Sequence, residues 1–356
     1  MKVKMIVTNP MTNDPRVYKE AKYYVMQGHE VEILCWDREN EAEVDEVREG
    51  IKLHRFHIYA KYASGFKNQI KAYLQFRKEC VKYLKNQKFD ILHCHDLDGA
   101  VVGLAVKNNV TKVFDMHEYY LTKGSKLLNR VFAFLVQTVQ NKFNYIIYLN
   151  DTQKADVQAK NTKKLLYLPN YPEKKLFVDI EKNKSNMIRI GYAGFIRCEK
   201  AFVNLFKTVK GTQNIRIDLY GEGCTVEKLL PYANDKIALH GKYNYNDAEK
   251  IYKDIDIVNC VYDTLENDGY PIKFFESMVT KTPVIADKNS IIAEVVKKYD
   301  IGFLVDVNDI YTYKVLMQQL NDNPQIVEQK VKNFDSVNMD ICWEDVAKCL
   351  DIICEK

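Results

Sequence analysis

Short β-rich runs alternate with helical patterns along almost the whole chain, and this alternation limits the fold more than any other feature. In the first half, the predicted strands are 3–8, 30–36, 51–56, 89–95, 112–117, 145–150 and 165–169. Strands that alternate with helices are typical of a parallel sheet covered on both faces. The first half is therefore predicted to be a doubly wound α/β domain.

The helix between the first two strands has its own start and stop signals. Asp14 is the predicted N-cap, Pro15 fits the first helical position, and Gly28 ends the helix. The apolar residues that mark its buried face at helical spacing are Val17, Ala21, Tyr24 and Val25.

The same pattern restarts in the second half. A polar, lysine-rich stretch at 173–187 has little to bury and is predicted to be a linker. The strands predicted after it are 188–194, 215–220, 236–240, 255–261, 282–286 and 301–305. We therefore predict an N-terminal domain over 1–172, a second doubly wound domain over 188–337 and a C-terminal helix over 338–356. A length of 356 residues suits two such domains.

The composition fits a globular protein in a reducing compartment. The net charge is only +4, which argues against a partner such as nucleic acid. The nine cysteines are odd in number and form no CxxC pair, so we expect buried free thiols. No signal peptide is visible, and no apolar run approaches the roughly 20 residues needed to span a bilayer. We expect a cytoplasmic protein, or one peripheral on the cytoplasmic face of the membrane.

Two basic segments of the first half carry apolar residues at helical spacing. Between Lys61 and Lys88, eight basic residues stand against one acid, Glu79, and the segment from Tyr119 to Lys142 has four basic residues and no acid. Basic amphipathic stretches are typical of contacts with an anionic membrane surface. The alternative is that both are core helices with a solvated polar face.

The segment from Asp268 to Glu276, DGYPIKFFE, is the most informative one for function. Gly269 and Pro271 predict a loop, and the apolar residues after it predict a buried helix with Glu276 in its first turns. A helix N-terminus offers unpaired N–H groups to an anion. The two carboxylates would accept hydrogen bonds from sugar hydroxyls. The simplest alternative is a capped helix with two surface acids.

A second motif, IGYAGFIRCEK, opens the second domain. A strand ends at Gly194, and Arg197 and Lys200 then stand three positions apart at the start of a helix. Gly194 permits close backbone approach, and the two cations would converge on a diphosphate. Gly221 lies in the turn YGEG after the next strand.

Together these motifs resemble those of glycosyltransferase family 4. The resemblance implies a GT-B fold, with two Rossmann-like domains facing across a cleft and a C-terminal helix crossing back to the first. It implies a nucleoside diphosphate sugar, most simply a UDP-sugar, as the donor substrate, and no separate cofactor. Family members usually have Glu at position 268 and Gly at position 201, where this chain has Asp268 and Ala201.

The resemblance also implies roles for individual residues. In the catalytic group, His117 contacts the donor sugar and phosphate, Asp268 holds sugar hydroxyls, and Arg197 and Lys200 stabilise the leaving diphosphate. Glu276 holds the ribose. The other residues of the implied donor pocket are Gly194, Gly221, Gly269, Tyr270, Pro271 and Lys273.

The acceptor side is implied by the first half of the chain. The candidates are Asn13, Arg16, His95 and Glu118. The loop after the first strand lacks the double glycine that many family members have. No spaced Cys/His motif supports a metal at the histidines, and both Asp-x-Asp strings, at 96–98 and 254–256, fit structural roles.

The function that follows is a retaining, metal-independent glycosyltransferase, of hexosyl or N-acetylhexosaminyl type, that transfers sugar to a saccharide acceptor. The basic amphipathic segments suggest a lipid-linked acceptor in surface polysaccharide or lipopolysaccharide synthesis. One alternative is a nucleotide-sugar epimerase of GT-B fold, and another is a non-catalytic sugar-nucleotide-binding partner subunit. The absence of a GxGxxG after the first strand argues against a Rossmann dehydrogenase.

Overall fold

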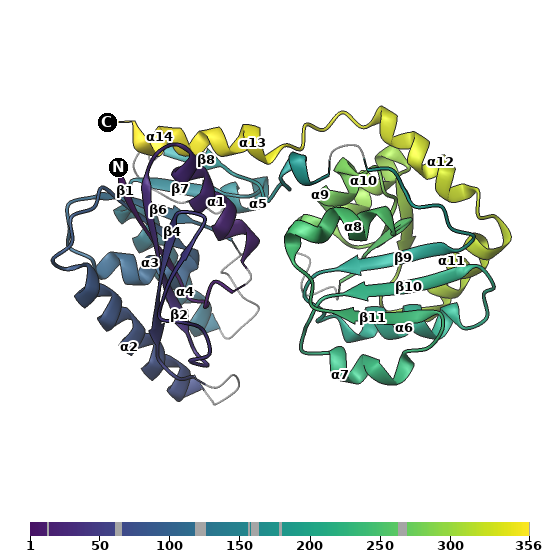
Figure 1. Ribbon diagram of the computed structural model, residues 1–356, viewed down its shortest axis with the longest axis horizontal. Coiled ribbons are helices and arrows are strands. Elements are labelled where there is room, and N and C mark those ends of the chain that lie inside the picture. Colours follow the sequence, from purple (N-terminus) through teal and green to yellow (C-terminus); the bar gives the residue numbers. More distant parts are fainter. Residues whose placement is uncertain are drawn as a thin grey trace. The chain divides into compact units, whose positions relative to one another are not determined.

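The computed structural model describes residues 1–12, 14–60, 66–117, 126–155, 157, 164–177, 180–262 and 269–355. The chain divides into two compact units (Figure 1). Unit 1 comprises Met1–Pro169 and Asp345–Lys356, and unit 2 comprises Asn170–Glu344. The C-terminal residues thus belong to unit 1. The stretch 173–187, for which the sequence predicts a linker, belongs to unit 2.

Unit 1 is built on a sheet with the strand order β3-β4-β2-β1-β5-β6-β7-β8. Its strands are β1 (Lys2–Val7), β2 (Glu30–Asp37), β3 (Asp45–Arg48), β4 (Ile51–His57), β5 (Ile91–His95), β6 (Thr111–Asp115), β7 (Tyr145–Tyr148) and β8 (Lys164–Tyr167). All neighbouring pairs are parallel except β3 with β4. The strands predicted for this half are confirmed. The sequence does not predict the edge strand β3, because its residues, DEVR, are mostly charged and none of them is buried.

Helices cover both faces of this sheet (Figure 1). They are α1 (Pro15–Met26), α2 (Phe66–Leu84), α3 (Asp96–Ala105), α4 (Lys126–Lys142) and α5 (Asp151–Ala155). Helix α3 contacts α2 and α4, and the apolar side chains of all three form one hydrophobic cluster with the strands. Helix α1 packs on the other face, beside the C-terminal turns at 347–350.

The predicted ends of α1 are confirmed. Asp14 accepts a hydrogen bond from the backbone N–H of Val17 at 3.1 Å, and Pro15 occupies the first turn. Gly28 follows the helix with a φ angle of 80°, which favours glycine. The C-terminal residues of the chain contact this helix. Tyr23 of α1 donates a hydrogen bond to Asp351 of α14 (Asp351–Cys354) at 3.0 Å.

Unit 2 is built on a fully parallel sheet with the order β11-β10-β9-β12-β13-β14. Counted along the chain this is 3-2-1-4-5-6, the strand order of Rossmann folds. The strands are β9 (Ile188–Ala193), β10 (Ile215–Tyr220), β11 (Ile237–Gly241), β12 (Ile257–Cys260), β13 (Val284–Asp287) and β14 (Gly302–Val305). All six are at the positions that the sequence predicts.

The helices of unit 2 also lie on both faces of its sheet (Figure 1). They are α6 (Glu199–Val209), α7 (Val226–Leu229), α8 (Ala248–Lys253), α9 (Ile272–Val279), α10 (Ile291–Tyr299), α11 (Ile310–Asp322) and α12 (Ile326–Asn333), with α13 (Trp343–Val346) at the boundary of the unit. Helices α6 and α11 pack together over one hydrophobic cluster. Helices α8, α9 and α10 cover the other face.

Lys182 anchors the stretch 173–187 to unit 2. Its Nζ atom donates hydrogen bonds to the carbonyl oxygens of Tyr252 and Ile255 at 2.8 and 2.7 Å, and to Oγ1 of Thr282 at 2.7 Å. A polar sequence therefore packs by hydrogen bonds where it has few apolar side chains to bury. All nine cysteines are free thiols, and six of them are buried. Among the described residues, no helix combines the length and apolar character needed to cross a membrane.

Candidate functional site

Parallel α/β sheets bind ligands beyond the carboxyl ends of their strands, at the point where the strand order reverses. In unit 2 this point lies between β9 and β12. Gly194 and Arg197 lie in the loop that follows β9, and the chain after β12 leads to Lys273 and Glu276 on α9. The topology therefore brings the two sequence motifs to one edge of the sheet.

Glycines bring the loops after β9 and β10 into backbone contact. A Cβ atom on Gly221 would lie 1.9 Å from the carbonyl oxygen of Gly194, and one on Gly223 would lie 2.0 Å from that of Ile196. Gly194 and Gly221 also have φ angles of 144° and 136°, which residues with a Cβ atom rarely adopt. Contact and conformation both require glycine here, so the two loops hold a fixed shape beside the start of α6.

Lys273 is a buried cation at the reversal point of unit 2, with 5% of its surface exposed. Its Nζ atom donates a hydrogen bond to the hydroxyl of Tyr262 at 2.6 Å and lies 4.2 Å from the ring centre of Tyr192. A Cβ atom on Gly194 would lie 3.2 Å from Nζ, so the lysine reaches the end of β9. Aromatic rings and a hydroxyl hold an ammonium group without cancelling its charge, which leaves it suited to bind an anion.

Arg197 and Lys200 are both exposed, and they point to different partners. The guanidinium of Arg197 lies 6.0 Å from the ring centre of Tyr262, and Nζ of Lys273 lies 5.2 Å from the same centre. Lys200 donates from Nζ to Oδ1 of Asn308 at 2.6 Å, in the loop after β14. The structure thus gathers Arg197 and Lys273 at one ring and directs Lys200 toward a neighbouring loop.

Glu276 is buried, with 2% of its surface exposed, so it is not the surface acid of the simplest alternative. Its Oε2 atom accepts a hydrogen bond from the hydroxyl of Tyr252 at 2.7 Å. Burial and the Glu276 charge raise the pKa of Tyr252 and of Tyr245 well above the ordinary value. These phenols therefore remain neutral hydrogen-bond donors around a buried carboxyl group.

The predicted loop before α9 is partly described. Asp268 lies outside the described residues. Pro271 occupies the N-cap position of α9 with φ −69° and ψ 149°, so the chain from Gly269 enters the helix from an extended conformation. The ring of Tyr270 stacks on that of Phe274, with centres 5.4 Å apart.

In unit 1 the strand order reverses between β1 and β5. Arg16 lies in the first turn of α1, which follows β1, while His95 ends β5 and His117 follows the neighbouring strand β6. The structure brings these three residues together. Asn13 and Glu118 lie outside the described residues.

His117 is enclosed by two carboxylates. Its Nε2 atom lies 2.8 Å from Oδ2 of Asp115, and its Nδ1 atom lies 3.4 Å from Oδ2 of Asp96. Its backbone N–H donates to Oδ1 of Asp96 at 3.2 Å. Burial alone would lower the pKa of His117, but Asp96 and Asp115 raise it to about 10. The side chain is therefore an imidazolium at neutral pH.

Arg16 supplies a second buried cation to the same cluster. Its Nη2 atom lies 2.8 Å from Oδ1 of Asp115 and 3.2 Å from Oε1 of Glu20, and its Nη1 atom donates to the carbonyl oxygen of Leu168 at 3.1 Å. Burial would raise the pKa of Asp115, but Arg16 and His117 lower it well below its ordinary value. Burial and the Asp115 charge raise the pKa of Glu20 well above its ordinary value, so Glu20 is a neutral acid.

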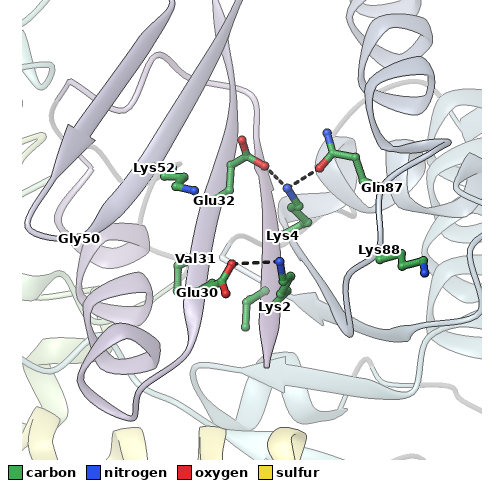
Figure 2. Close-up of a pocket in the computed structure, with 10 residues that line it drawn as sticks. Lys2, Lys4, Glu30, Val31, Glu32, Gly50, Lys52, Gln87 and Lys88 are labelled. Carbon is green, nitrogen blue, oxygen red and sulfur yellow. Dashed lines mark hydrogen bonds and ion pairs between the residues drawn. The ribbon is translucent and has the colours of Figure 1, made fainter.

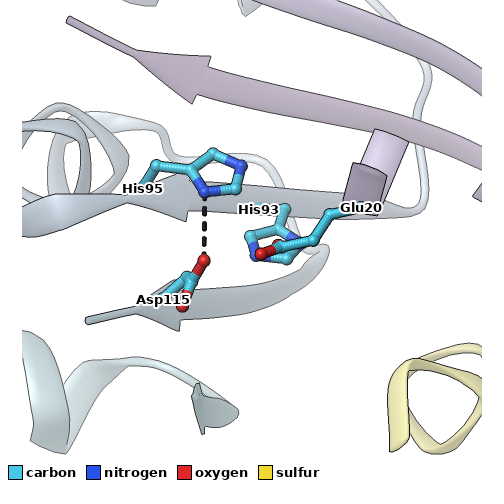
Figure 3. Close-up of side chains that lie close together, drawn as sticks. All are labelled: Glu20, His93, His95 and Asp115. Carbon is cyan, nitrogen blue, oxygen red and sulfur yellow. Dashed lines mark hydrogen bonds and ion pairs between the residues drawn. The ribbon is translucent and has the colours of Figure 1, made fainter. Parts of the chain in front are cut away.

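His93 and His95 lie on the face of β5 that points toward α1, because side chains two apart on a strand share a face. Their rings stack with centres 4.6 Å apart. Burial lowers the pKa of both, so both are neutral. His95 approaches Oδ2 of Asp115 at 3.2 Å, and His93 lies 3.4 Å from Oε2 of Glu20 (Figure 3).

Glu20, His93, His95 and Asp115 form the one group in the described part of the chain whose residue types and spacing suggest a metal site. Their ligand atoms lie within 4.8 Å of one another. Two ligands of one zinc ion, at about 2.1 Å each, stand at most about 4.2 Å apart, so the side chains would have to move. Arg16 already contacts both carboxyl groups. A cation here would compete with that guanidinium, and we assign no metal to the cluster.

A pocket of about 460 Å³ lies elsewhere in unit 1, at the amino ends of its strands (Figure 2). Lys2 faces Glu30 at 3.2 Å, and Lys4 contacts Glu32 and Gln87. Lys2 and Lys4 of β1 thus pair with the two glutamates of β2. The pocket is at the opposite edge of the sheet from His117 and takes no part in the candidate site.

Motif reasoning assigns no role to several residues of the site. Glu20 stands four positions after Arg16, which is one helical turn, and this spacing is a signal that the sequence offers. Tyr192, Tyr252 and Tyr262 offer none, because aromatic residues in strands and helices usually belong to the core.

Three comparisons place this architecture among known proteins. The sucrose-phosphate synthase of Thermosynechococcus elongatus superposes with a TM-score of 0.76 at 13% identity, over 99% of this chain and 98% of that one. The Anabaena protein HepE, solved in complex with UDP-glucose, gives a TM-score of 0.70 at 14% identity over 99% of each chain. A mutant of S. aureus TarM, in complex with Fondaparinux, alpha-GlcNAc-glycerol and UDP, gives 0.71 at 13% identity over the full length of both chains. At these identities the likeness shows the fold, which is GT-B. A search of curated protein sequences found no significant match.

Family models account for both halves of the sequence. The model described as a glycosyl transferase 4-like domain matches residues 14–170, and the model described as glycosyl transferases group 1 matches residues 173–335. The two matches meet where the structure divides into its two units. The chain belongs to the GT4 glycosyltransferases of GT-B fold, which pair these two domains.

Proposed function

We propose that the protein is a retaining, metal-independent glycosyltransferase that moves a hexosyl or N-acetylhexosaminyl group from a UDP-sugar to a saccharide acceptor. The observation that carries this proposal is the buried ammonium of Lys273, held by Tyr262 and Tyr192 at the reversal point of unit 2. Arg197 shares the ring of Tyr262. Two cations gathered at one phenol ring suit a diphosphate, and HepE carries UDP-glucose on the same fold.

Each residue then has a role in the transfer. Arg197 and Lys273 hold the diphosphate and stabilise the charge that builds on it as the glycosidic bond breaks, with Lys200 in support. Glu276 accepts hydrogen bonds from the ribose hydroxyls, and Asp268 accepts hydrogen bonds from the hydroxyls of the sugar. These last two roles rest on the resemblance of the motif.

The reaction proceeds by front-side displacement. The buried carboxylates of unit 1 are unsuited to attack the sugar, because Asp115 is held by Arg16 and Glu20 is neutral. The acceptor oxygen instead bonds to the anomeric carbon on the face that the diphosphate leaves. The departing phosphate oxygen takes the electron pair of the broken bond and then the acceptor's proton.

Turnover of defined donors tests this function. Purified protein is incubated with UDP-glucose, UDP-GlcNAc and GDP-mannose, with and without saccharide acceptors, and after exhaustive EDTA treatment. We expect a transfer product whose anomeric configuration matches that of the donor, with full activity after EDTA. Conversion of the donor to an epimer would identify an epimerase. UDP binding without turnover on any acceptor would identify a non-catalytic subunit.

We further propose that the acceptor is lipid-linked and that unit 1 docks on the cytoplasmic face of a membrane, in surface polysaccharide or lipopolysaccharide synthesis. Helices α2 and α4 flank α3 on the same face of the sheet. Leu74 and Phe134 on these helices are exposed by 51% and 68%. Exposed basic residues accompany them, among them Lys78, Lys82 and Arg130. Residues 61–65 of the first predicted segment and residues 119–125 of the second lie outside the described residues.

Vesicle flotation tests the membrane proposal. Wild-type protein should float with vesicles containing phosphatidylglycerol and release as salt rises, because exposed charges are screened within about 10 Å in 0.1 M salt. Reversal of Lys78, Lys82 and Arg130 to Glu should abolish flotation. Reversal of the exposed Lys210 and Lys314 of unit 2 is the matched control and should leave it intact. Equal flotation with neutral vesicles would contradict an electrostatic surface.

A further inference from the structure

A tyrosine on a neighbouring helix holds one of the two carboxyl oxygens of Glu276. The hydroxyl of Tyr252 lies 2.7 Å from Oε2 of Glu276 and 3.4 Å from the carbonyl oxygen of Lys273. A phenol has one O–H proton to donate, so Tyr252 donates along the shorter contact, to Glu276. Only 1% of the surface of Tyr252 is exposed. Burial therefore protects this hydrogen bond from competition with solvent.

Tyr252 is also held by its ring and by its backbone. It lies in the last turn of α8, where its ring meets the ring of Phe177 edge-on, with centres 5.4 Å apart. Its carbonyl oxygen accepts a hydrogen bond from Nζ of Lys182 at 2.8 Å. Phe177 is itself buried, and both Phe177 and Lys182 belong to the stretch 173–187. This polar stretch thus fixes the phenol that contacts Glu276.

A hydrogen bond at one oxygen sets the plane of a carboxyl group. The last torsion of a glutamate side chain has a broad range, so its carboxyl group turns easily when nothing holds it. The Tyr252 hydroxyl restricts Glu276 to orientations in which Oε2 faces α8. The other oxygen, Oε1, is then presented in one direction, in the way that outer hydrogen bonds orient the ligands of a metal.

A second tyrosine near Glu276 provides a comparison. Tyr245 lies in the 3₁₀ turn Tyr245–Asp247 before α8, and burial together with the Glu276 charge raises its pKa. Its hydroxyl is buried, but it makes no well-formed hydrogen bond with any residue that the structure describes. Of these two phenols, Tyr252 is therefore the one that fixes the carboxyl group.

We propose that Tyr252 is a positioning residue, which holds Glu276 through Oε2 so that Oε1 accepts a hydrogen bond from a ribose hydroxyl of the nucleotide. Tyr252 acts only through Glu276 and does not touch the substrate. That the group received by Glu276 is a ribose rests on the proposed function. The orientation of Glu276 by Tyr252 does not.

Calorimetric titration of three ligands tests this role. UDP carries the ribose hydroxyls and the diphosphate, 2′,3′-dideoxy-UDP lacks those hydroxyls, and pyrophosphate lacks the whole nucleoside. In Tyr252→Phe, the Kd for UDP should rise about tenfold, because the acceptor of the ribose hydrogen bond loses its orientation. The other two ligands should bind the variant and the wild type equally. An unchanged Kd for UDP overturns the proposal, as does an equal loss of all three ligands.

Further variants separate positioning from general damage. Tyr313→Phe is the matched control, because Tyr313 is equally buried and lies on α11, over the other face of the sheet, so no Kd should change. Tyr245→Phe should raise the Kd for UDP by less than Tyr252→Phe does, and equal increases would contradict the role given to Tyr252. If Tyr252→Phe does not fold, Phe177→Leu loosens the same ring and should weaken UDP without weakening 2′,3′-dideoxy-UDP.

A double-mutant cycle shows whether Tyr252 acts through Glu276. Once Glu276→Ala has removed the carboxyl group, adding Tyr252→Phe should change the Kd for UDP by about twofold or less. Additive losses contradict the proposal. If the loss in Tyr252→Phe depends on the ribose hydroxyls but no sugar is transferred from any donor, the proposed function fails and the role of Tyr252 stands. If sugar is transferred and the loss does not depend on those hydroxyls, only the role of Tyr252 fails.

Discussion

The reversal points of the two units place a buried cation in opposite surroundings. In unit 1, Arg16 contacts two carboxyl groups, of Asp115 and Glu20. In unit 2, Lys273 contacts a phenol and aromatic rings. The first cation completes an internal charge balance, whereas the second keeps its charge for a ligand. The partner of a buried cation thus indicates whether it serves stability or binding, and its removal in each unit tests this distinction.

The largest expected effect is on the stability of unit 1. Arg16→Met leaves the buried carboxylate of Asp115 without its guanidinium, and breaking a buried ion pair by removing one partner costs about 3–5 kcal/mol. Urea unfolding followed by circular dichroism measures the free energy of unfolding. Arg130→Met, at an exposed position of α4, is the control and should change it little. A cost below about 1 kcal/mol for Arg16→Met would show that the carboxylates do not depend on it.

Lys273→Met should show the reverse pattern. Methionine fills most of the same space among the aromatic rings, so the free energy of unfolding should change by less than it does in Arg16→Met. The affinity for UDP should fall by about 1.5–3 kcal/mol, roughly tenfold to 150-fold, because charge-assisted hydrogen bonds to phosphate are lost. Uridine, which lacks the diphosphate, should bind almost unchanged. Calorimetric titration of both ligands decides between the two patterns.

Arg197→Ala and Lys200→Ala sharpen this measurement. Arg197 shares the ring of Tyr262 with Lys273, while the ammonium of Lys200 is engaged by Asn308. We therefore expect a greater loss of UDP affinity from Arg197→Ala. Equal losses of UDP and uridine in either variant would mean that the cation does not hold phosphate.

The contrast between the units also explains what the sequence can predict. The strands and α1 are encoded locally, by runs of β-branched residues and by Asp14, Pro15 and Gly28, so their positions follow from the sequence. The edge strand β3 is not encoded in this way. It exists because β4 offers it a partner, and its charged residues give no hydrophobic pattern.

The residues of the candidate site also differ in whether a local pattern identifies them. Lys273 and Glu276 lie in one short segment, so a motif identifies them. The cluster in unit 1 is assembled from α1, β5 and β6, and Glu20 and Asp115 are 95 positions apart in the chain. Their proximity depends on the strand order, which no local pattern contains. Period-two spacing places His93 and His95 on one face, but it does not say that Glu20 covers them.

One titrating residue in each unit should change the free energy of unfolding in alkaline solution, and the two changes should have opposite signs. The pKa of His117 is raised to about 10, so its contribution to stability is complete below 6.5 and is lost as pH rises through 10. Burial lowers the pKa of Lys182 from 10.5 to about 7, so folding releases its proton between those values and stability rises with pH there. Each slope is at most about 1.4 kcal/mol per pH unit.

Single variants isolate the two slopes. Free energies of unfolding are measured at pH 7, 8.5 and 10 for the wild type, His117→Gln and Lys182→Met. The advantage of the wild type over His117→Gln should shrink toward pH 10, whereas its advantage over Lys182→Met should grow. If both advantages shrink or both grow as pH rises, the charge states assigned to His117 and Lys182 are contradicted.

The smallest expected effect comes from a buried acid. Glu20 is fully buried, and an ionised carboxylate at this position would be costly to replace. Burial and the Asp115 charge keep the Glu20 carboxyl group neutral. Glutamine is nearly isosteric with a neutral glutamic acid and also has a donor to offer Asp115, so Glu20→Gln should change the free energy of unfolding by less than about 1 kcal/mol.

Glu46 provides the matched comparison for Glu20, because it is more exposed and yet ionised. It accepts a hydrogen bond from the buried Arg55 at 2.6 Å, and the pKa of its carboxyl is lowered by Arg55 and Arg48 against the opposing effect of burial. Glu46→Gln should cost about 1–3 kcal/mol, since it removes charge-assisted hydrogen bonds from Arg55. The more exposed acid should therefore be the more costly one to replace, in chemical denaturation at pH 7. If Glu20→Gln proves the more destabilising, Glu20 is ionised in the folded protein, and Arg16 balances two negative charges rather than one.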